Sequence, residues 1–332
     1  MDHRKPFPML RLPFVPLQEV FKAMDPFEII NFSIISKRAK AITKQMSFCP
    51  RYSIRLFIDE TLGIEIRGTD KLGLSMYLIT PDKRIDGKIV EIERVGFILR
   101  RVYKYSKDPV DEWKQLCIYV LEIFKKQTID VLSMTMDDFV DQNVSIIDFL
   151  RTNVKSVDVC YLFQSEEEND VNEHAAYLLN NLKVNNVLNF LLDMKNGNFD
   201  GKIPKNLKEL HILSSQWIGY EKLLEIDCKR VVLRDNQISN KQWNLFLKKW
   251  IAVETHSNLE YLHLDYREIE EFKTLVLHDI PHEVVDGGVK RTINGYLNSH
   301  IEINGGIDIR RVDGKTATFF VFQMEFLAMS VN

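Results

Sequence analysis

Hydrophobic residues near the start of the chain recur at helical spacing. Four of them fall at i, i+3, i+4 and i+7 and predict one apolar stripe on a short helix: Leu17, Val20, Phe21 and Met24. Residues 25–28 (Asp-Pro-Phe-Glu) predict the start of a second helix, with an acceptor at the cap, proline at the first helical position and glutamate at the third. Residues 36–46 predict a third, basic helix.

The second of these helices is apolar around more of its circumference than one buried face requires. Its hydrophobic residues are Phe27, Ile29, Ile30, Phe32, Ile34 and Ile35. Three short helices cannot bury this much apolar surface by themselves, because small modules cover their own core poorly. We therefore expect either the rest of the chain or a partner protein to cover it.

The hydrophobic pattern then changes to a period of two. It predicts an antiparallel β meander with three strands, at residues 52–58, 62–66 and 72–76. From about residue 108 strands alternate with helices, beginning with an amphipathic helix at residues 113–124 and a strand at 129–134. This change separates a meander or linker at residues 49–107 from a larger domain at residues 108–332.

The spacing L-x-x-L-x-L, typical of leucine-rich repeats, recurs in the larger domain. It begins at Val154, Leu207, Cys228 and Leu259. The third instance is the fullest, because Asn236 stands where such repeats bond the backbone of a turn. Strands and intervening helices in repeated register predict a curved solenoid with parallel strands on one side and helices on the other. A plain α/β domain whose apolar runs mimic the repeat is the alternative.

The end of the chain departs from this repeat. Residues 305–319 alternate on both sides of Asp313-Gly314, which predicts a β hairpin. The expected fold is therefore α/β: a three-helix module at residues 1–48, a short antiparallel β meander, and a leucine-rich-repeat-like β/α solenoid that ends in a C-terminal β hairpin.

Composition narrows the possible functions. The 332 residues carry a net charge of −3, so the chain has no overall positive electrostatic field that would attract nucleic acid or an anionic membrane. The chain has no run of 18 apolar residues, no signal-peptide core and no CxxC pair among its four cysteines. A reducing compartment, the cytoplasm or the nucleus, is expected.

Catalytic motifs are absent as well. The chain lacks phosphate-binding glycine loops, the H-E-x-x-H motif and the nucleophile elbow. His278 and His282 are four residues apart, but Pro281 between them argues against a metal pair on one helix. We therefore expect no catalytic residue, no cofactor, no metal and no enzyme activity.

The N-terminal pattern resembles the F-box. The resemblance rests on residues 12–13 (Leu-Pro), the helix with Leu17 and Phe21, the break at residues 25–26 and the basic third helix. It departs from the usual pattern at residues 14–16 (Phe-Val-Pro), where the family commonly has an acidic residue. The resemblance implies docking to the Skp-type adaptor of a cullin ubiquitin ligase through these residues: Leu12, Pro13, Leu17, Val20, Phe21, Ile29, Ile30 and Ile34.

The whole chain resembles nematode F-box proteins with a type-2 F-box-associated domain. Further motifs that carry this resemblance are residues 239–250 (SNKQWNLFLKKW), 258–262 (NLEYL) and 305–315 (GGIDIRRVDGK). It implies a substrate-recognition subunit of an SCF ligase, linked through the adaptor to a cullin, that binds a protein substrate with its C-terminal domain. The repeat geometry places these candidate substrate contacts on the concave face: Glu209, His211, Arg230, Val232, Arg234, Tyr261, His263 and Asp265.

Two other functions stay open at this point. One is a leucine-rich-repeat-like scaffold whose N-terminal helices only cap its hydrophobic end; it predicts that residues 1–48 pack onto residues 52–130 and bind nothing. The other is an enzyme whose site is built from residues distant in sequence, which a deep polar pocket with convergent ionisable groups would favour.

Overall fold

The computed structural model of the chain forms two compact units. It describes residues 9–46, 51–68, 74–94, 97–194, 199–266, 268–295, 299–322 and 326–332. The first unit consists of Met1–Met134 and Asp141–Val157, and the second of Thr135–Val140 and Asp158–Asn332. Within the described residues, no helix is long and apolar enough to cross a membrane.

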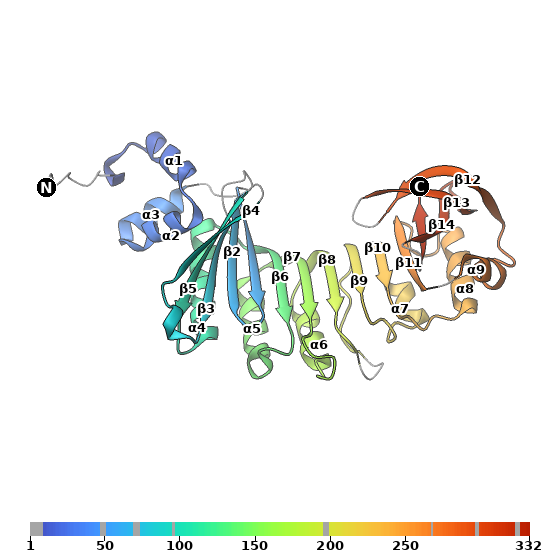
Figure 1. Cartoon of the computed structure of the whole chain (residues 1–332), viewed down its shortest axis with the longest axis horizontal. Helices are drawn as coiled ribbons and strands as arrows, with labels where there is room; N and C mark the ends of the chain where they lie inside the picture. Colours follow the sequence, from blue (N-terminus) through green and yellow to red (C-terminus); the bar gives the residue numbers. More distant parts are fainter. Residues whose placement is uncertain are drawn as a thin grey trace. The chain divides into compact units, whose positions relative to one another are not determined.

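The first unit begins with the predicted helices (Figure 1). A short 3-10 turn, η1 (Met9–Arg11), precedes α1 (Phe14–Ala23), α2 (Pro26–Ile34) and α3 (Lys37–Gln45). The capping box of α2 is confirmed: Asp25 accepts a hydrogen bond from the Glu28 backbone N–H at 2.8 Å, and Glu28 accepts one from the Asp25 N–H at 2.9 Å. Two backbone N–H groups that have no partner within the helix, those of Asp25 and Glu28, are thereby hydrogen-bonded. α2 therefore begins directly after Asp25.

A mixed sheet follows in the first unit. Its strands are β1 (Tyr52–Ile58), β2 (Leu62–Gly68), β3 (Leu74–Thr80), β4 (Ile89–Arg94), β5 (Phe97–Tyr105) and β6 (Thr128–Thr135), in the order β6-β1-β2-β3-β5-β4. The predicted antiparallel meander is confirmed as β1–β2–β3. Its third strand runs over residues 74–80 rather than 72–76, and residues 69–73 lie outside the described part. Strands β4 and β5 fill a stretch that the sequence analysis treated as linker.

Helices accompany this sheet. They are η2 (Lys83–Ile85), α4 (Pro109–Phe124) and α5 (Asn143–Asn153), with η3 (Val140–Gln142) leading into α5. The predicted amphipathic helix is thus confirmed as α4, which buries Trp113 completely. The Trp113 indole donates a 3.3 Å hydrogen bond to the Gly63 carbonyl of β2 and so ties α4 to the sheet.

The second unit alternates strands and helices before it becomes all antiparallel. Its elements are β7 (Ser156–Phe163), α6 (Asn172–Asn181), β8 (Val184–Leu191), β9 (Leu207–Ile212), α7 (Tyr220–Glu225), β10 (Cys228–Leu233), α8 (Asn240–Ile251), β11 (Tyr261–Tyr266), α9 (Ile269–Leu275), β12 (His282–Asn294), β13 (His300–Arg310), β14 (Thr316–Phe322) and β15 (Phe326–Val331). Strands β8 to β11 are parallel neighbours. The order then continues β11-β15-β14-β13-β12 with antiparallel pairs.

Asn236 confirms the expected turn in the fullest repeat instance. Its side-chain amide donates hydrogen bonds to the carbonyls of Leu233 at 3.2 Å and Leu264 at 2.9 Å. Its oxygen accepts one from the Ile238 N–H at 3.2 Å. Asn236 therefore joins the ends of β10 and β11 within a buried region.

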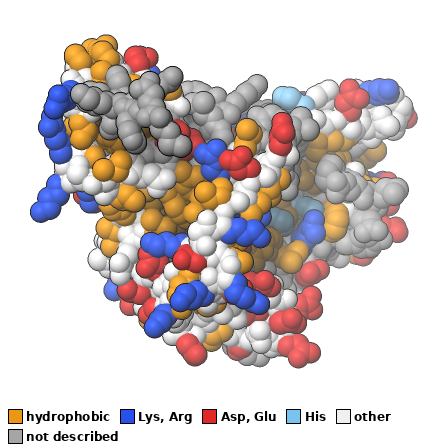
Figure 2. Space-filling view, turned by 60° about the vertical axis from the view of Figure 1, so that its left-hand side comes forward, with side chains coloured by type: hydrophobic (Ala, Val, Ile, Leu, Met, Phe, Trp, Pro, Cys, Tyr) orange, Lys and Arg blue, Asp and Glu red, His pale blue; other side chains and the backbone are white. Residues whose placement is uncertain are grey.

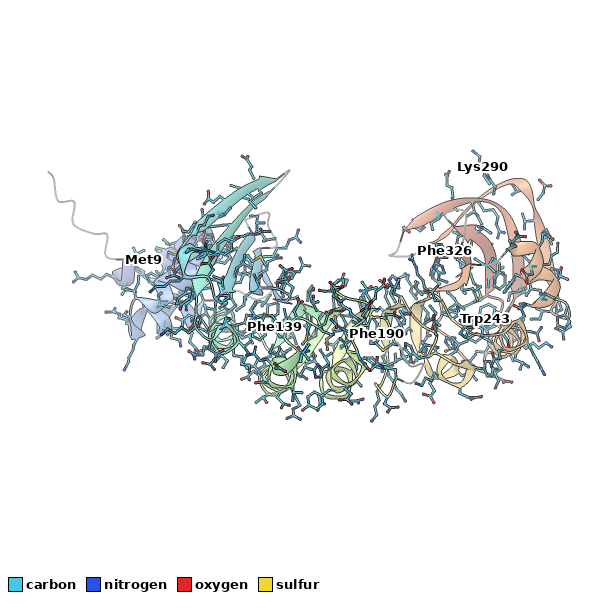
Figure 3. All side chains as sticks on the ribbon, turned by 60° about the horizontal axis from the view of Figure 1, so that its bottom comes forward. Met9, Phe139, Phe190, Trp243, Lys290 and Phe326 are labelled. Atoms are coloured by element: carbon cyan, nitrogen blue, oxygen red, sulfur yellow. The ribbon has the colours of Figure 1, made fainter. Side chains whose placement is uncertain are left out.

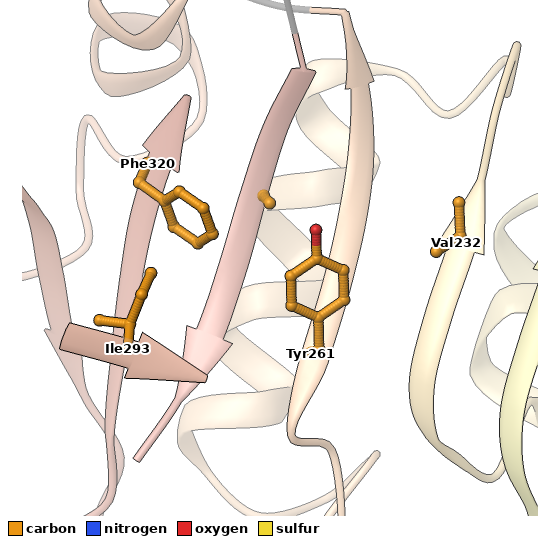
Figure 4. Close-up of a cluster of buried hydrophobic side chains, with 5 residues drawn as sticks. Val232, Tyr261, Ile293 and Phe320 are labelled. Atoms are coloured by element: carbon orange, nitrogen blue, oxygen red, sulfur yellow. The ribbon is translucent and has the colours of Figure 1, made fainter. Parts of the chain in front are cut away.

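The C-terminal strands curl over one face of the parallel strands. Val232 of β10, Tyr261 of β11, Ile293 of β12, Phe320 of β14 and Ala328 of β15 form one buried cluster, which lies on the side of the strands away from the helices (Figure 4). Figure 3 likewise shows Trp243 on the helix side and Phe326 on the opposite side.

A glycine pair permits this curl. In β13, Gly305 and Gly306 have φ values of +68° and +119°, a region that favours glycine. A Cβ on Gly305 would lie 2.7 Å from the Val285 carbonyl oxygen. The predicted hairpin itself is confirmed as β13–β14, with Gly314 at φ +94° in its turn.

Replacing Asn236 with alanine should destabilise the second unit by about 1–3 kcal/mol, because two buried carbonyls lose their donor. Chemical denaturation of the full chain, followed by circular dichroism, measures this change. Asn153→Ala is the matched control: its amide also bonds a backbone carbonyl, that of Phe149, but it is exposed on α5, and we expect a loss below about 0.5 kcal/mol. Equal losses in the two variants would contradict this role of Asn236.

Candidate functional site

Four of the predicted adaptor-binding residues are buried within the chain itself. They are Leu17 and Phe21 of α1, and Ile29 and Ile30 of α2. Phe21 also packs edge-on against Phe32, with ring centroids 5.4 Å apart. The contact between Phe21 and Phe32 joins α1 to α2.

The N-terminal helices pack onto the rest of the first unit through both apolar and polar contacts. The Phe27 ring meets the Tyr77 ring of β3 edge-on at 4.6 Å. The hydroxyls of Ser33 on α2 and Tyr119 on α4 are hydrogen-bonded at 2.7 Å. One inner face of the helices is therefore covered by the chain itself.

Charged residues add to this packing. Lys40 and Lys44 of α3 both pair with Glu122 of α4, at 2.8 and 2.9 Å. Hydrogen bonds from the two lysines hold the pKa of Glu122 below its usual range. Arg100 of β5 pairs with Asp25, the cap of α2. These contacts fix α2 and α3 on the first unit.

Other apolar side chains at the ends of α1 and α2 stay exposed. Of the predicted adaptor-binding residues, Pro13 and Ile34 are exposed, while Leu12 and Val20 are half-buried. Three further apolar residues that the sequence analysis did not single out are also exposed: Phe14, Val15 and Ile35. Figure 2, which brings the N-terminal end forward, shows hydrophobic side chains at the surface beside Lys and Arg. The exposed residues lie at the ends of α1 and α2 that are remote from the turn at Met24.

The predicted substrate-contact residues are neighbours on one face of β9, β10 and β11. Glu209, Arg230 and Tyr261 form one row across the three strands. His211, Val232 and His263 form the next row. The structure therefore brings together residues that are up to about fifty positions apart in sequence.

The first row contains a largely buried ion-pair network. Arg230 donates to Glu209 at 3.2 Å and to Glu260 at 2.8 Å, and Lys229 donates to Glu260 at 2.8 Å. A buried guanidinium needs such partners, because an uncompensated charge there is costly. In this structure the two basic and two acidic side chains neutralise one another within the network.

The second row has two histidines near Arg234, of which His263 is buried and His211 is half-buried. The His263 ring meets the Phe326 ring at 4.7 Å, and the Arg234 guanidinium lies over the same ring at 5.0 Å. Burial, and then the charge of Arg234, lowers the pKa of His211 and of His263 to about 4. Both histidines are therefore neutral near pH 7. The side chain of the remaining candidate, Asp265, lies outside the described residues.

Most of this predicted face is not open to solvent. Val232, Tyr261 and His263 are buried, and Glu209 and Arg230 are 9% exposed. The cover comes from the C-terminal strands, whose Ile293, Phe320 and Ala328 complete the cluster around Val232. The repeat pattern could not predict this burial, because the residues that cover Val232 lie about sixty to a hundred positions after it in the sequence. Arg234 and His211 keep partial exposure.

The groups that the sequence analysis examined for chemistry have structural roles. Burial raises the pKa of the Cys160 and Cys228 thiols to about 12 and also raises that of Cys117, so these thiols are not nucleophiles near neutral pH. Cys49 lies outside the described residues. Among the residues the structure does describe, no three His, Cys, Asp or Glu side chains gather as a metal site.

Asp137 illustrates such a structural role. It accepts hydrogen bonds from the backbone of Ser165 and Glu166 at 2.9 Å each, and from the Asn169 amide at 3.0 Å. Burial alone would raise the pKa of Asp137, but these hydrogen bonds outweigh it and lower that pKa. Asp137 thus organises the acidic loop at residues 164–170.

Two family models match parts of the chain. Residues 9–51 match the model of the F-box domain. This chain is an F-box protein. Residues 198–264, which include β9, β10 and most of β11, match the F-box associated model.

Two curated proteins of Caenorhabditis elegans are similar to this F-box protein. The Skn-1 dependent zygotic transcript 15 protein is 21% identical over 97% of this chain and 96% of its own length. An uncharacterized protein is 28% identical over 39% of this chain and 30% of its own length. No solved structure matches significantly.

Acid should destabilise this F-box protein through His263. In the unfolded chain the histidine binds a proton near pH 6.5, but in the folded chain only near pH 4. Between these values the unfolded state holds more protons, so stability falls as pH falls from about 6.5, by about 2 kcal/mol at pH 5. Denaturation at pH 7.5 and pH 5 should show His263→Phe losing less stability than wild type.

The control for that measurement is His300→Phe. His300 is exposed at the start of β13, so its removal should leave the wild-type pH dependence unchanged. If His263→Phe keeps the full acid loss, the buried neutral histidine is not its source.

Proposed function

We propose that this F-box protein is a non-catalytic substrate-recognition subunit of an SCF ubiquitin ligase. The N-terminal helices bind the Skp-type adaptor, and through it a cullin, while the second unit binds a protein substrate. The observation that carries the proposal is the exposed apolar surface left on α1 and α2 after their inner face is packed. This role places the protein in the cytoplasm or nucleus.

The exposed ends of α1 and α2 are the proposed adaptor surface. Ile34 and Ile35 are 63% and 72% exposed, and Phe14 and Val15 are exposed at the other helix. Covering a large aliphatic side chain contributes about 1.5–3 kcal/mol, so these residues would contribute substantially to the free energy of an adaptor complex. Several exposed apolar side chains on a small module are typical of a protein-interaction site.

We propose that the four buried residues among the predicted adaptor-binding residues do not contact the adaptor but support the helices that do. Leu17, Phe21, Ile29 and Ile30 hold α1 and α2 in the orientation that presents Pro13 and Ile34. Leu12 and Val20, which are half-buried, lie at the edge of the surface. Substitution of a buried member would therefore weaken adaptor binding through loss of the helix pair.

The mechanism is an increase in effective concentration. A substrate held by the second unit is brought close to the ubiquitin-charged enzyme on the cullin, so transfer becomes effectively intramolecular. We assign residues 1–48 to the adaptor and residues 108–332 to substrate recognition. The strand–helix units between β7 and β11 are proposed to act as a leucine-rich-repeat-like solenoid, with His211 and Arg234 as its solvent-reachable candidate contacts.

A scaffold without a ligase role is the second candidate. It is favoured by one observation: α2 packs onto β3 and α4, through Phe27 and Ser33, as a capping module would. A pure cap, however, gives no reason for Ile34 and Ile35 to be apolar and exposed. Adaptor binding separates the two candidates.

The test is co-elution of the full chain with a Skp-type adaptor on a sizing column. Ile34→Glu with Ile35→Glu should lower the affinity at least tenfold, because two charges enter an apolar contact while the exposed sites leave the helix core intact. Unchanged circular dichroism verifies that the fold is retained. Titration of the purified adaptor by calorimetry gives the affinity.

The matched control is Val284→Glu with Val312→Glu, which places the same charges on exposed valines of the second unit, 57% and 74% exposed. Its affinity should stay within twofold of wild type. Failure of the wild-type chain to bind any of several adaptor paralogues would overturn the ligase role and favour the scaffold function.

A further inference from the structure

A pocket of the second unit lies on its helix side, between α6 and α7. It has a volume of about 920 Å³. Its walls come from the end of α6 with the start of β8, from residues 201–205, and from Trp217 with α7 and Ile226. A cavity of this size is at the upper end of the range for ligand pockets. It lies largely within the stretch that matches the F-box associated model.

The floor of this pocket is apolar and tightly packed. Its buried residues are Leu179, Leu182, Val184, Trp217 and Ile226. The Trp217 ring packs against Phe199 at 4.7 Å and against Phe190 at 5.9 Å. Figure 3 marks Phe190 on β8. The aromatic packing gives an incoming apolar side chain a preformed surface.

The rim of the pocket is basic. Lys183, Lys202 and Lys205 are exposed, and Glu225 is the one acidic residue among those that line the cavity. Lys222 is half-buried, donates to the Phe199 carbonyl at 2.8 Å and lies over the Trp217 ring at 4.9 Å.

These four lysines are not neutralised by the protein. Within the described ranges none of them forms an ion pair, whereas lysines elsewhere do, such as Lys229 with Glu260 and Lys248 with Asp279. The whole chain has a net charge of −3, so an unpaired basic rim is a local departure from its charge balance. Unpaired cations around an apolar floor are complementary to a ligand that is both anionic and apolar.

We propose that this pocket binds an acidic peptide segment of the substrate, with one or two apolar side chains on its floor and carboxylates along its rim. The four ammonium groups come from three separate segments, at Lys183, at residues 201–205 and at Lys222, so they fit charges spread along an extended chain. A single phosphate would instead favour a converging arginine fork, and the pocket lining contains no arginine. The assignment to a substrate rests on the proposed ligase function.

The test uses defined peptides and the full chain. Fluorescence polarisation compares ten-residue libraries that mix Glu with Leu and Phe, Lys with Leu and Phe, or Glu with Ser. Wild type should bind the best members of the first library at least tenfold more tightly than those of the other two. Lys183→Glu, Lys202→Glu and Lys205→Glu together should weaken that binding at least tenfold.

The control variant is Lys107→Glu, Lys241→Glu and Lys290→Glu, three exposed lysines that are not part of the pocket lining and undergo the same charge reversal. Its peptide affinity should stay within twofold of wild type. Equal losses in both variants, or equal binding of all three libraries, would overturn the peptide site. So would binding of phosphatidylserine vesicles that the pocket variant alone loses, without any preference for acidic peptides.

Co-elution with the adaptor tests the ligase function independently of the peptide pocket. The pocket variant should still bind the Skp-type adaptor with wild-type affinity. An adaptor complex without peptide selectivity refutes the pocket alone. Selective peptide binding by a chain that binds no adaptor refutes the ligase role and leaves the acidic-peptide site standing.

Discussion

The need to cover both faces of the parallel strands shapes the second unit. β10 and β11 carry apolar side chains on each face, so helices alone cannot bury them. The C-terminal strands cover the remaining face by bringing Ile293, Phe320 and Ala328 against Val232 and Tyr261. Because this cover is supplied, the face with Glu209 and Arg230 becomes interior, and its charges pair internally. Surfaces available to a partner are thereby shifted to other parts of the unit.

The same principle governs the N-terminal helices, with a different outcome. α2 is apolar on two sides, and the chain covers only one of them, through Phe27, Ser33 and the contacts of α3 with Glu122. The uncovered side ends in Ile34 and Ile35. An adaptor that covers this side would complete the burial that the chain leaves unfinished, and this is how a small module gains both a fixed position and a binding surface.

The basic pocket gives the second unit a surface that the covered strand face no longer provides. Its apolar floor is held by Trp217 and Phe199, and its unpaired lysines stand on segments that flank the parallel strands. A rigid floor with a charged rim selects a partner by its mixture of acidic and apolar side chains. Substrate recognition on the helix side is compatible with strands that are closed by the C-terminal sheet.

Local signals in the sequence determined the elements. The capping box at Asp25, the turn residue Asn236 and the alternation around Gly314 each act within a few residues, so their structures follow from the sequence alone. The F-box match rests on such signals as well. Which side chains are reachable was decided by contacts between distant segments. Ile29 and Ile34 have the same local chemistry, yet only tertiary packing buries one and exposes the other, and only the curl at Gly305 closes the face that contains His263.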